Sequence, residues 1–339
     1  MQVGLGVEVG VSLPSSMNST GVGTASRPLQ NRMQQDYFIR GPSSDPGKWL
    51  QCSRCRKCMR QAFALFFALL ALLAPASPCR AVPALSPTAL DLGFHQMYNL
   101  QFEEAHRTFN GWEQLHPDDP LGPASDAAAY LFSELDRLGV LQWELFLDDE
   151  KFKRSRKLTP DHATRQAFEK ALAKSEQEAD SVLARSPQDG NALLAKIMDL
   201  GLRSDYLALV EKRYLASLGY MKNARILANK LLTMDPSFYD AYLAIGVENY
   251  ILGLKSAPVR WLLRVCGAQT DKDLGIEKLR LTAEKGHYLL PLAQLMLAVA
   301  ALRDKNREQA RELLAGLARQ FPNNTLYRRE LDRLQPAPK

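Results

Sequence analysis

Four cysteines near the start of the chain have the spacing that most resembles a metal or redox site. Residues 52–79 read CSRCRKCMRQAFALFFALLALLAPASPC, with three cysteines at C-x-x-C-x-x-C spacing and a fourth after an apolar run. A structural zinc site needs four ligands from two half-sites, an iron–sulfur run needs a nearby fourth cysteine, and haem attachment needs C-x-x-C-H. This stretch meets none of these requirements, so we favour another role for it and keep a metal site as an alternative.

The apolar run between these cysteines is typical of a secretory signal. Ala62–Leu73 is uninterrupted but much shorter than the roughly 18–20 residues that cross a bilayer. Basic residues precede it and the small-residue text APASPCRAVPA follows it, which is the order of a cleavable signal peptide. We therefore expect a signal peptide over 59–81, with translation starting at Met59. Residues 1–58 are expected to be a disordered upstream extension or a misassigned start, in agreement with the Gly-, Ser-, Pro- and Gln-rich composition of residues 1–50.

Two alternatives would keep the chain at a membrane. The apolar run can remain uncleaved as a signal anchor, or a lipid can be attached to Cys79. Pro78 precedes this cysteine, where bacterial lipoproteins normally have Gly, Ala or Ser. If cleavage occurs after Cys79, Cys266 is the one cysteine left, so the mature fold depends on packing rather than on an intrachain disulfide.

The remaining chain has few residues in catalytic patterns. It contains no HExxH, GxSxG, phosphate-binding loop or dinucleotide fingerprint. Its histidines do not share one helix face at metal-ligand spacing, and we interpret them as ordinary surface or core residues: His95, His106, His116, His162 and His287. We therefore predict no enzymatic activity, no cofactor and no metal site. An α-helical envelope enzyme whose site no motif reveals is the alternative.

The net charge of +6 is confined to the leader. Nine basic and three acidic residues precede residue 82, which leaves 34 of each sign in 82–339. A neutral segment lacks the basic footprint of a nucleic-acid-binding protein, so we predict a protein partner instead.

Helical periodicity dominates residues 82–339, with almost no strand signal. Apolar residues recur at three- and four-residue steps between Pro and Gly breaks. The clearest segments predict helices over 126–147, capped by Ser125, and over 163–185. The expected fold class is therefore all-α.

Four segments end in similar sequence motifs, in each of which a predicted helix is followed by a turn that contains proline. They are EQLHPDDP, SVLARSPQDG, LLTMDPSFYD and ARQFPNNT, with the prolines Pro117, Pro187, Pro236 and Pro322. Such a pattern resembles the tetratricopeptide repeat family, a 34-residue helix-turn-helix unit with small residues where its helices cross. In that register Gly93, Ala105 and Phe109 match one unit, Gly246 a second, and Ala298, Ala310 and Leu314 a third.

This resemblance implies a helical-hairpin solenoid over 82–339, with divergent middle repeats and a polar last helix that closes the stack. It also implies an inner groove lined by one face of each first helix. In register, the groove residues are Leu90, Phe94, Met97, Leu243, Val247, Tyr250, Leu295 and Val299. Their apolar character disfavours a carboxylate clamp and favours an apolar or helical segment of a partner. Alternatively, the chain's own inserted helices fill the groove.

An insertion in the second matched unit reads YILGLKSAPVRWLLRVCGAQT, residues 250–270. It predicts a short amphipathic helix, capped by Gly267, in which Arg260, Trp261, Leu262 and Arg264 are candidate membrane or partner contacts. Because the helix is short, we favour ordinary packing against the chain with the arginines in solvent.

These features predict a non-catalytic repeat scaffold exported to the periplasm or cell envelope, most simply of a Gram-negative bacterium. A membrane-anchored envelope assembly factor is the alternative, held by the leader, by Cys79 or by the inserted helix. The sequence does not identify the partner.

Overall fold

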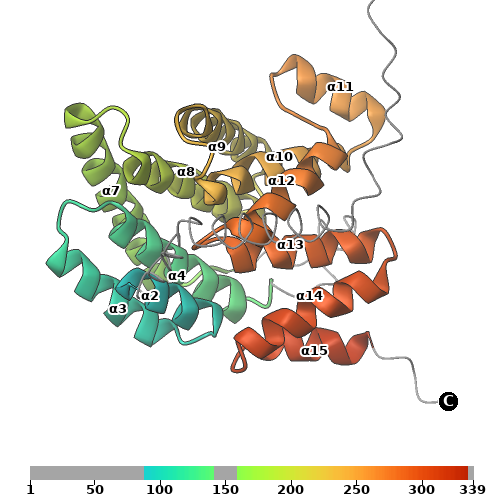
Figure 1. The fold of residues 1–339 in the computed structure, drawn as a ribbon, viewed down its shortest axis with the longest axis horizontal. Helices are drawn as coiled ribbons and strands as arrows, with labels where there is room; N and C mark the ends of the chain where they lie inside the picture. The colour runs from blue at the N-terminus through green and yellow to red at the C-terminus, as the bar shows by residue number, and fades with distance from the viewer. Residues whose placement is uncertain (1–87, 141–158, 335–339) are drawn as a thin grey trace, which may run out of the picture. The chain divides into compact units, whose positions relative to one another are not determined.

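The computed structural model describes residues 88–140 and 159–334, and each regular element within these ranges is a helix (Figure 1). The all-α expectation is confirmed. The expected extension 1–58 and signal peptide 59–81, including Cys79, lie outside the described residues. The helices are α2 (Ala89–Tyr98), α3 (Phe102–Leu115), α4 (Leu121–Arg137), α7 (His162–Arg185), α8 (Gly190–Asp205), α9 (Tyr214–Met234), α10 (Tyr242–Gly253), α11 (Ala257–Val265), α12 (Lys272–Lys285), α13 (Leu290–Arg303), α14 (Arg307–Gln320) and α15 (Thr325–Arg333). A π-helical turn, η2 (Tyr206–Val210), follows α8, and a 3-10 turn, η3 (Tyr239–Ala241), precedes α10.

The helices pack against one another in pairs, as hairpins. The pairs are α2 with α3, α4 with α7, α8 with α9, α10 with α12, and α13 with α14. The helix predicted over 163–185 is α7, which begins one residue earlier. Each of the four predicted proline turns follows a helix, namely α3, α7, α9 or α14.

Two glycines show how closely the helices of a hairpin approach. A Cβ atom on Gly93 of α2 would lie 2.2 Å from Cε1 of Phe109 on α3. On α10, a Cβ atom on Gly246 would lie 2.9 Å from Cγ of Leu279 on α12. Both distances are shorter than van der Waals contact, so a larger residue at either position would force the helices apart.

The helix predicted over 126–147 is wrong at both ends. It begins at Leu121, where Asp119 Oδ1 accepts the backbone N–H of Leu121 at 3.1 Å. Ser125 lies inside the helix and donates to Leu121 O, so it is not the cap. The helix ends at Arg137 because Gly139 adopts φ 66° and closes a Schellman turn, in which Val140 N donates to Leu135 O.

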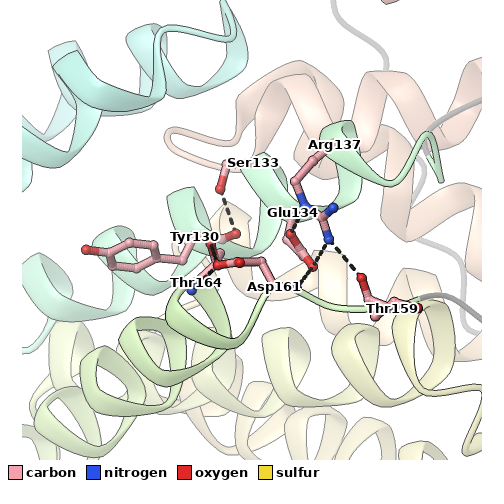
Figure 2. Close-up of polar contacts among 7 residues, drawn as sticks. All are labelled: Tyr130, Ser133, Glu134, Arg137, Thr159, Asp161 and Thr164. Carbon is pink, nitrogen blue, oxygen red and sulfur yellow. Dashed lines mark hydrogen bonds and ion pairs between the residues drawn. The ribbon is translucent and has the colours of Figure 1, made fainter.

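A polar cluster joins the end of α4 to the beginning of α7 (Figure 2). The buried carboxylate of Glu134 accepts both Nε and Nη2 of Arg137, at 2.7 and 2.8 Å. Glu134 also accepts the backbone N–H of Asp161 at 2.8 Å, while Asp161 caps α7 by accepting Thr164 N. Arg137 reaches further to Thr159 O. Glu134 therefore fixes the start of α7 relative to α4.

The first and last hairpins of the described chain contact each other. Tyr98 on α2 donates through its hydroxyl to Tyr288 O, and its own carbonyl accepts Asn324 Nδ2. His287 Nε2 lies 2.5 Å from Asp91 Oδ1. Other contacts join the same segments: Asn99 with Asn323, Phe94 with Tyr288, and Tyr98 with Phe321. Helix α2 thus packs both on its partner α3 and on the region around α13 to α15.

Candidate functional site

An apolar cavity of about 280 Å³ lies among the helices of residues 88–334. Its walls come from α2, α4, α8, α9, α10 and α13, together with the π-helical turn η2. Most lining residues are Leu, Ile, Val, Met, Phe or Ala. The volume lies near the lower end of the range of small-molecule sites, roughly 300–1,000 Å³. The cavity is therefore large enough to hold a ligand or a short apolar chain.

Seven of the eight side chains predicted from the repeat register line this one cavity. They are Phe94, Met97, Leu243, Val247, Tyr250, Leu295 and Val299. The eighth, Leu90, is 2% exposed and packs in the core outside the cavity wall. The structure thus brings together residues of α2, α10 and α13, which are far apart in the sequence.

Sequence reasoning missed the part of the wall that α4, α8 and α9 supply. On α4, the residues at positions 128, 131, 132 and 135 all face the cavity. Their i, i+3, i+4, i+7 spacing is the signal of an apolar helix face, so it was readable as a stripe. It could not be assigned to the cavity because these helices diverge from the repeat pattern.

Several polar groups of the cavity wall are committed to structural contacts. The carboxylate of Asp240 accepts the backbone N–H groups of His287, Tyr288 and Leu289 at 2.9–3.1 Å and so fixes the turn that leads into α13. The hydroxyls of Ser204 and Ser217 pair at 2.9 Å between α8 and α9.

Asp205 differs from these groups. It is the last residue of α8, directly before η2, and its side chain lines the cavity. No described residue forms a hydrogen bond or ion pair with its carboxyl group. Burial raises the pKa of the Asp205 carboxyl to about 7. The cavity therefore contains one acidic group that can meet a donor or a cation on an incoming molecule.

A second acid of α8, Asp199, is buried between α7 and the start of α4. Ser175 Oγ lies 2.7 Å from Asp199 Oδ2 and 3.2 Å from Pro120 O. A hydroxyl has one hydrogen, so Ser175 can donate either to an ionised Asp199 or to Pro120 O, which also accepts Ala124 N at 3.1 Å, and Asp199 Oδ1 has no hydrogen-bond partner among the described residues. Protonated Asp199 can donate to Ser175, which then donates to Pro120 O. Burial raises the pKa of Asp199 to about 8, which agrees with a neutral carboxyl group at pH 7.

The inserted helix α11 is present and ends as predicted. Gly267 adopts φ 82°, and Ala268 N donates to Leu263 O in a Schellman turn. The expectation that this helix packs its apolar side against the chain is wrong, because no residue of α11 is buried. Trp261 is 67% exposed and Leu262 57%. Nor does α11 fill the predicted groove, since none of its residues lines the cavity.

The two arginines of α11 turn toward the chain. Arg260 Nη1 lies 2.9 Å from Lys255 O and 3.4 Å from Gly253 O. Arg264 Nε donates to Thr270 Oγ1 at 2.7 Å, although Arg264 remains exposed to solvent. Arg260 thus holds the helix from its inner side, Arg264 lies at the border between the two sides, and the apolar residues occupy the outer side.

A buried network fixes the segment that follows α11. Arg225 on α9 donates through Nε to Glu248 Oε2 at 2.7 Å and through Nη2 to Gly267 O at 3.0 Å. The other carboxylate oxygen of Glu248 accepts Gln269 N at 2.9 Å. Asn249 adds two hydrogen bonds, one to the Gln269 side chain and one from Asp271 N. The insertion is therefore anchored at its base.

The remaining residues with reactive side chains are dispersed. His106 Nδ1 lies 2.6 Å from Asp126 Oδ1, and the imidazole packs on Tyr130, whereas His116 stacks on Trp112. Cys266 is an exposed free thiol at the end of α11. Within residues 88–140 and 159–334, no group of three or more His, Cys, Asp or Glu side chains could hold a metal ion.

Neither the helices nor comparisons with known proteins assign the chain to a known class. In the described part, no helix combines the length and the apolar character needed to span a membrane. A comparison of the chain with protein-family models, with curated proteins and with solved structures finds no match.

Proposed function

We propose that this chain is an exported, non-catalytic protein of the tetratricopeptide type that holds an apolar segment of a partner protein in its central cavity. The observation that carries the proposal is the convergence of seven predicted groove residues on one cavity. The repeat pattern of the sequence predicts these residues, and they come from three separate hairpins.

The helix crossings support the repeat assignment. Glycine stands at the predicted close approach of α2 to α3 and of α10 to α12, with a large side chain opposite it. In the hairpin of α13 and α14, Ala298 and Ala310 are fully buried at the corresponding positions. Small residues there allow close helix contact, as a repeat of this type requires.

Export to the periplasm or envelope rests on the leader, as does the alternative of a membrane-anchored assembly factor. Osmotic shock distinguishes the two: release of the protein supports the exported form, and resistance of the membrane-bound protein to carbonate supports the anchored form. The enzymatic alternative would use the polar groups of the cavity wall; Asp240, Ser204 and Ser217 are engaged in structural hydrogen bonds, and Asp205 is the acidic group that this alternative would use.

Filling the cavity tests the binding proposal. Gly201 lines the cavity, and a Cβ atom added to it meets no atom within 4 Å. Gly201→Met should therefore occupy the cavity without straining the fold, and should gain roughly 1 kcal/mol of helix propensity. A photo-crosslinking amino acid at Leu292, in the same wall, reports the partner in the envelope fraction.

Gly219→Met on α9 is the matched control. Gly219 also has open space around its Cβ position but does not line the cavity. We expect crosslinking to fall at least about tenfold in Gly201→Met and to persist in Gly219→Met, because an occupied cavity excludes the partner. Equal crosslinking in the two variants would contradict the proposal.

A further inference from the structure

The outer side of α11 forms a compact apolar surface with a defined orientation. At 100° per residue, Trp261, Leu262 and Val265 fall within an arc of about 100° on one side of the helix. Their exposed fractions are 67%, 57% and 68%. Val259, 44% exposed, extends the same side. We refer to these four residues as the α11 apolar face. In Figure 1, α11 lies at the edge of the group of helices, beyond α10 and α12.

The α11 apolar face is rigidly displayed. Arg260 and Arg264 tie the helix to the chain, and the Arg225–Glu248 pair anchors the segment that follows. A helix detached from the rest of the fold would lack these hydrogen bonds. The arrangement keeps large apolar side chains in water at a free-energy cost, which indicates that another phase or molecule covers them in use.

The surroundings of the face are positively charged. Residues 256–270 contain two basic residues, Arg260 and Arg264, and no acidic residue. Arg260 and Arg264 donate to carbonyl or hydroxyl oxygens, and Lys222 Nζ donates to Cys266 O. These acceptors are neutral, so they leave the positive charge of each group uncompensated.

We propose that the α11 apolar face docks on an anionic lipid surface, with Trp261 and Leu262 entering the interfacial region and the exposed Arg264, which borders Trp261 on the helix, meeting lipid phosphates. An apolar face with Trp, bordered by Lys and Arg, has the composition of interfacial helices. Anionic lipid complements the charge, whereas a purely apolar partner would leave it unmatched. This inference is independent of the cavity and goes beyond the proposed function.

Cosedimentation of the full chain with vesicles tests the inference. One set of vesicles contains phosphatidylcholine alone and the other contains phosphatidylglycerol as well. We expect tighter binding to the second set, weakened by salt, and a loss of at least about tenfold in the double variant Trp261→Ser/Leu262→Ser. Arg264→Gln should weaken binding to the phosphatidylglycerol vesicles and leave binding to phosphatidylcholine unchanged.

The matched control is Leu115→Ser/Leu215→Ser, since these residues are 76% and 85% exposed on other helices. All variants carry the same leader, so any binding by the leader is common to them. Wild-type binding by the Trp261→Ser/Leu262→Ser variant would overturn the proposal. So would a photo-crosslinker at Val265 that captures an acidic protein and no lipid.

Discussion

The central cavity and α11 place similar apolar side chains in opposite environments. In the cavity, residues of α2, α10 and α13 face inward and line a shared space. On α11, Trp261 and its neighbours face outward, and no residue of the helix is buried. Helices α10 and α13 are apolar on most sides, whereas α11 is amphipathic and still turns its apolar side outward, so amphipathicity alone does not decide which side of a helix meets the chain.

Polar contacts determine why the apolar residues of α11 face outward while those of the cavity helices face inward. The cavity helices pack through small residues such as Gly93 and Gly246, which bring apolar faces together. In α11 the side away from Leu262 carries Arg260 and Arg264, whose hydrogen bonds go to the chain itself, although Arg264 stays exposed at the border of the apolar face. A helix whose basic side is bound must leave its apolar side outward.

The largest effect is expected from breaking the anchor of the insertion. Arg225→Met leaves Glu248, whose side chain is 1% exposed, without its ionic partner. Since an uncompensated buried charge is costly, we expect the free energy of unfolding to fall by about 4 kcal/mol. Denaturant unfolding measures this loss, and hydrogen exchange should increase first at residues 266–271.

Two variants control this prediction. Arg280→Met removes an exposed arginine of α12 and should change stability by less than about 0.5 kcal/mol. The double variant Arg225→Met/Glu248→Met should recover most of the loss, because it removes both charges. If the double variant is as unstable as the single one, packing rather than charge holds the insertion.

A smaller effect is expected at the first helix crossing. Gly93→Ala places a methyl group within 2.2 Å of the Phe109 ring, and we expect a loss of about 2 kcal/mol. Gly111→Ala on α3 is the control, because its Cβ position is open and alanine favours a helix by up to about 1 kcal/mol. Thermal unfolding of both variants checks the opposite signs. Stabilisation by both substitutions would mean that α2 and α3 are further apart than described.

The helices and much of the cavity could be predicted from the sequence, because local periodicity and the proline turns mark where helices begin and end. The end of α4 was missed, although the left-handed Gly139 that terminates it has a local signal. Three other features had no such signal. The walls from α8 and α9, the isolation of Asp205 and the orientation of α11 depend on contacts between distant segments. Lys222 and Arg225 of α9, which donate to the carbonyls of Cys266 and Gly267 at the end of α11, illustrate this dependence.

The pH dependence of stability reports how much less water reaches the cavity than the solvent-facing side of α11. With its pKa raised to about 7, Asp205 holds its proton in the folded chain at pH values where the unfolded chain, with a carboxyl pKa near 3.9, has lost it. The free energy of unfolding should therefore fall as the pH rises from about 4 to about 7, and then level off.

Asp205→Asn removes this dependence. Relative to wild type, the variant should gain about 2 kcal/mol of stability between pH 4 and pH 8, less than the full pKa shift implies because solvent reaches part of the cavity. Asp199→Asn is the companion variant, with the same sign and a window that extends to about pH 8. Urea unfolding at several pH values gives both profiles. If the Asp205→Asn and wild-type profiles run parallel, water reaches Asp205 freely, and the cavity is then no more apolar in effect than the surface around α11.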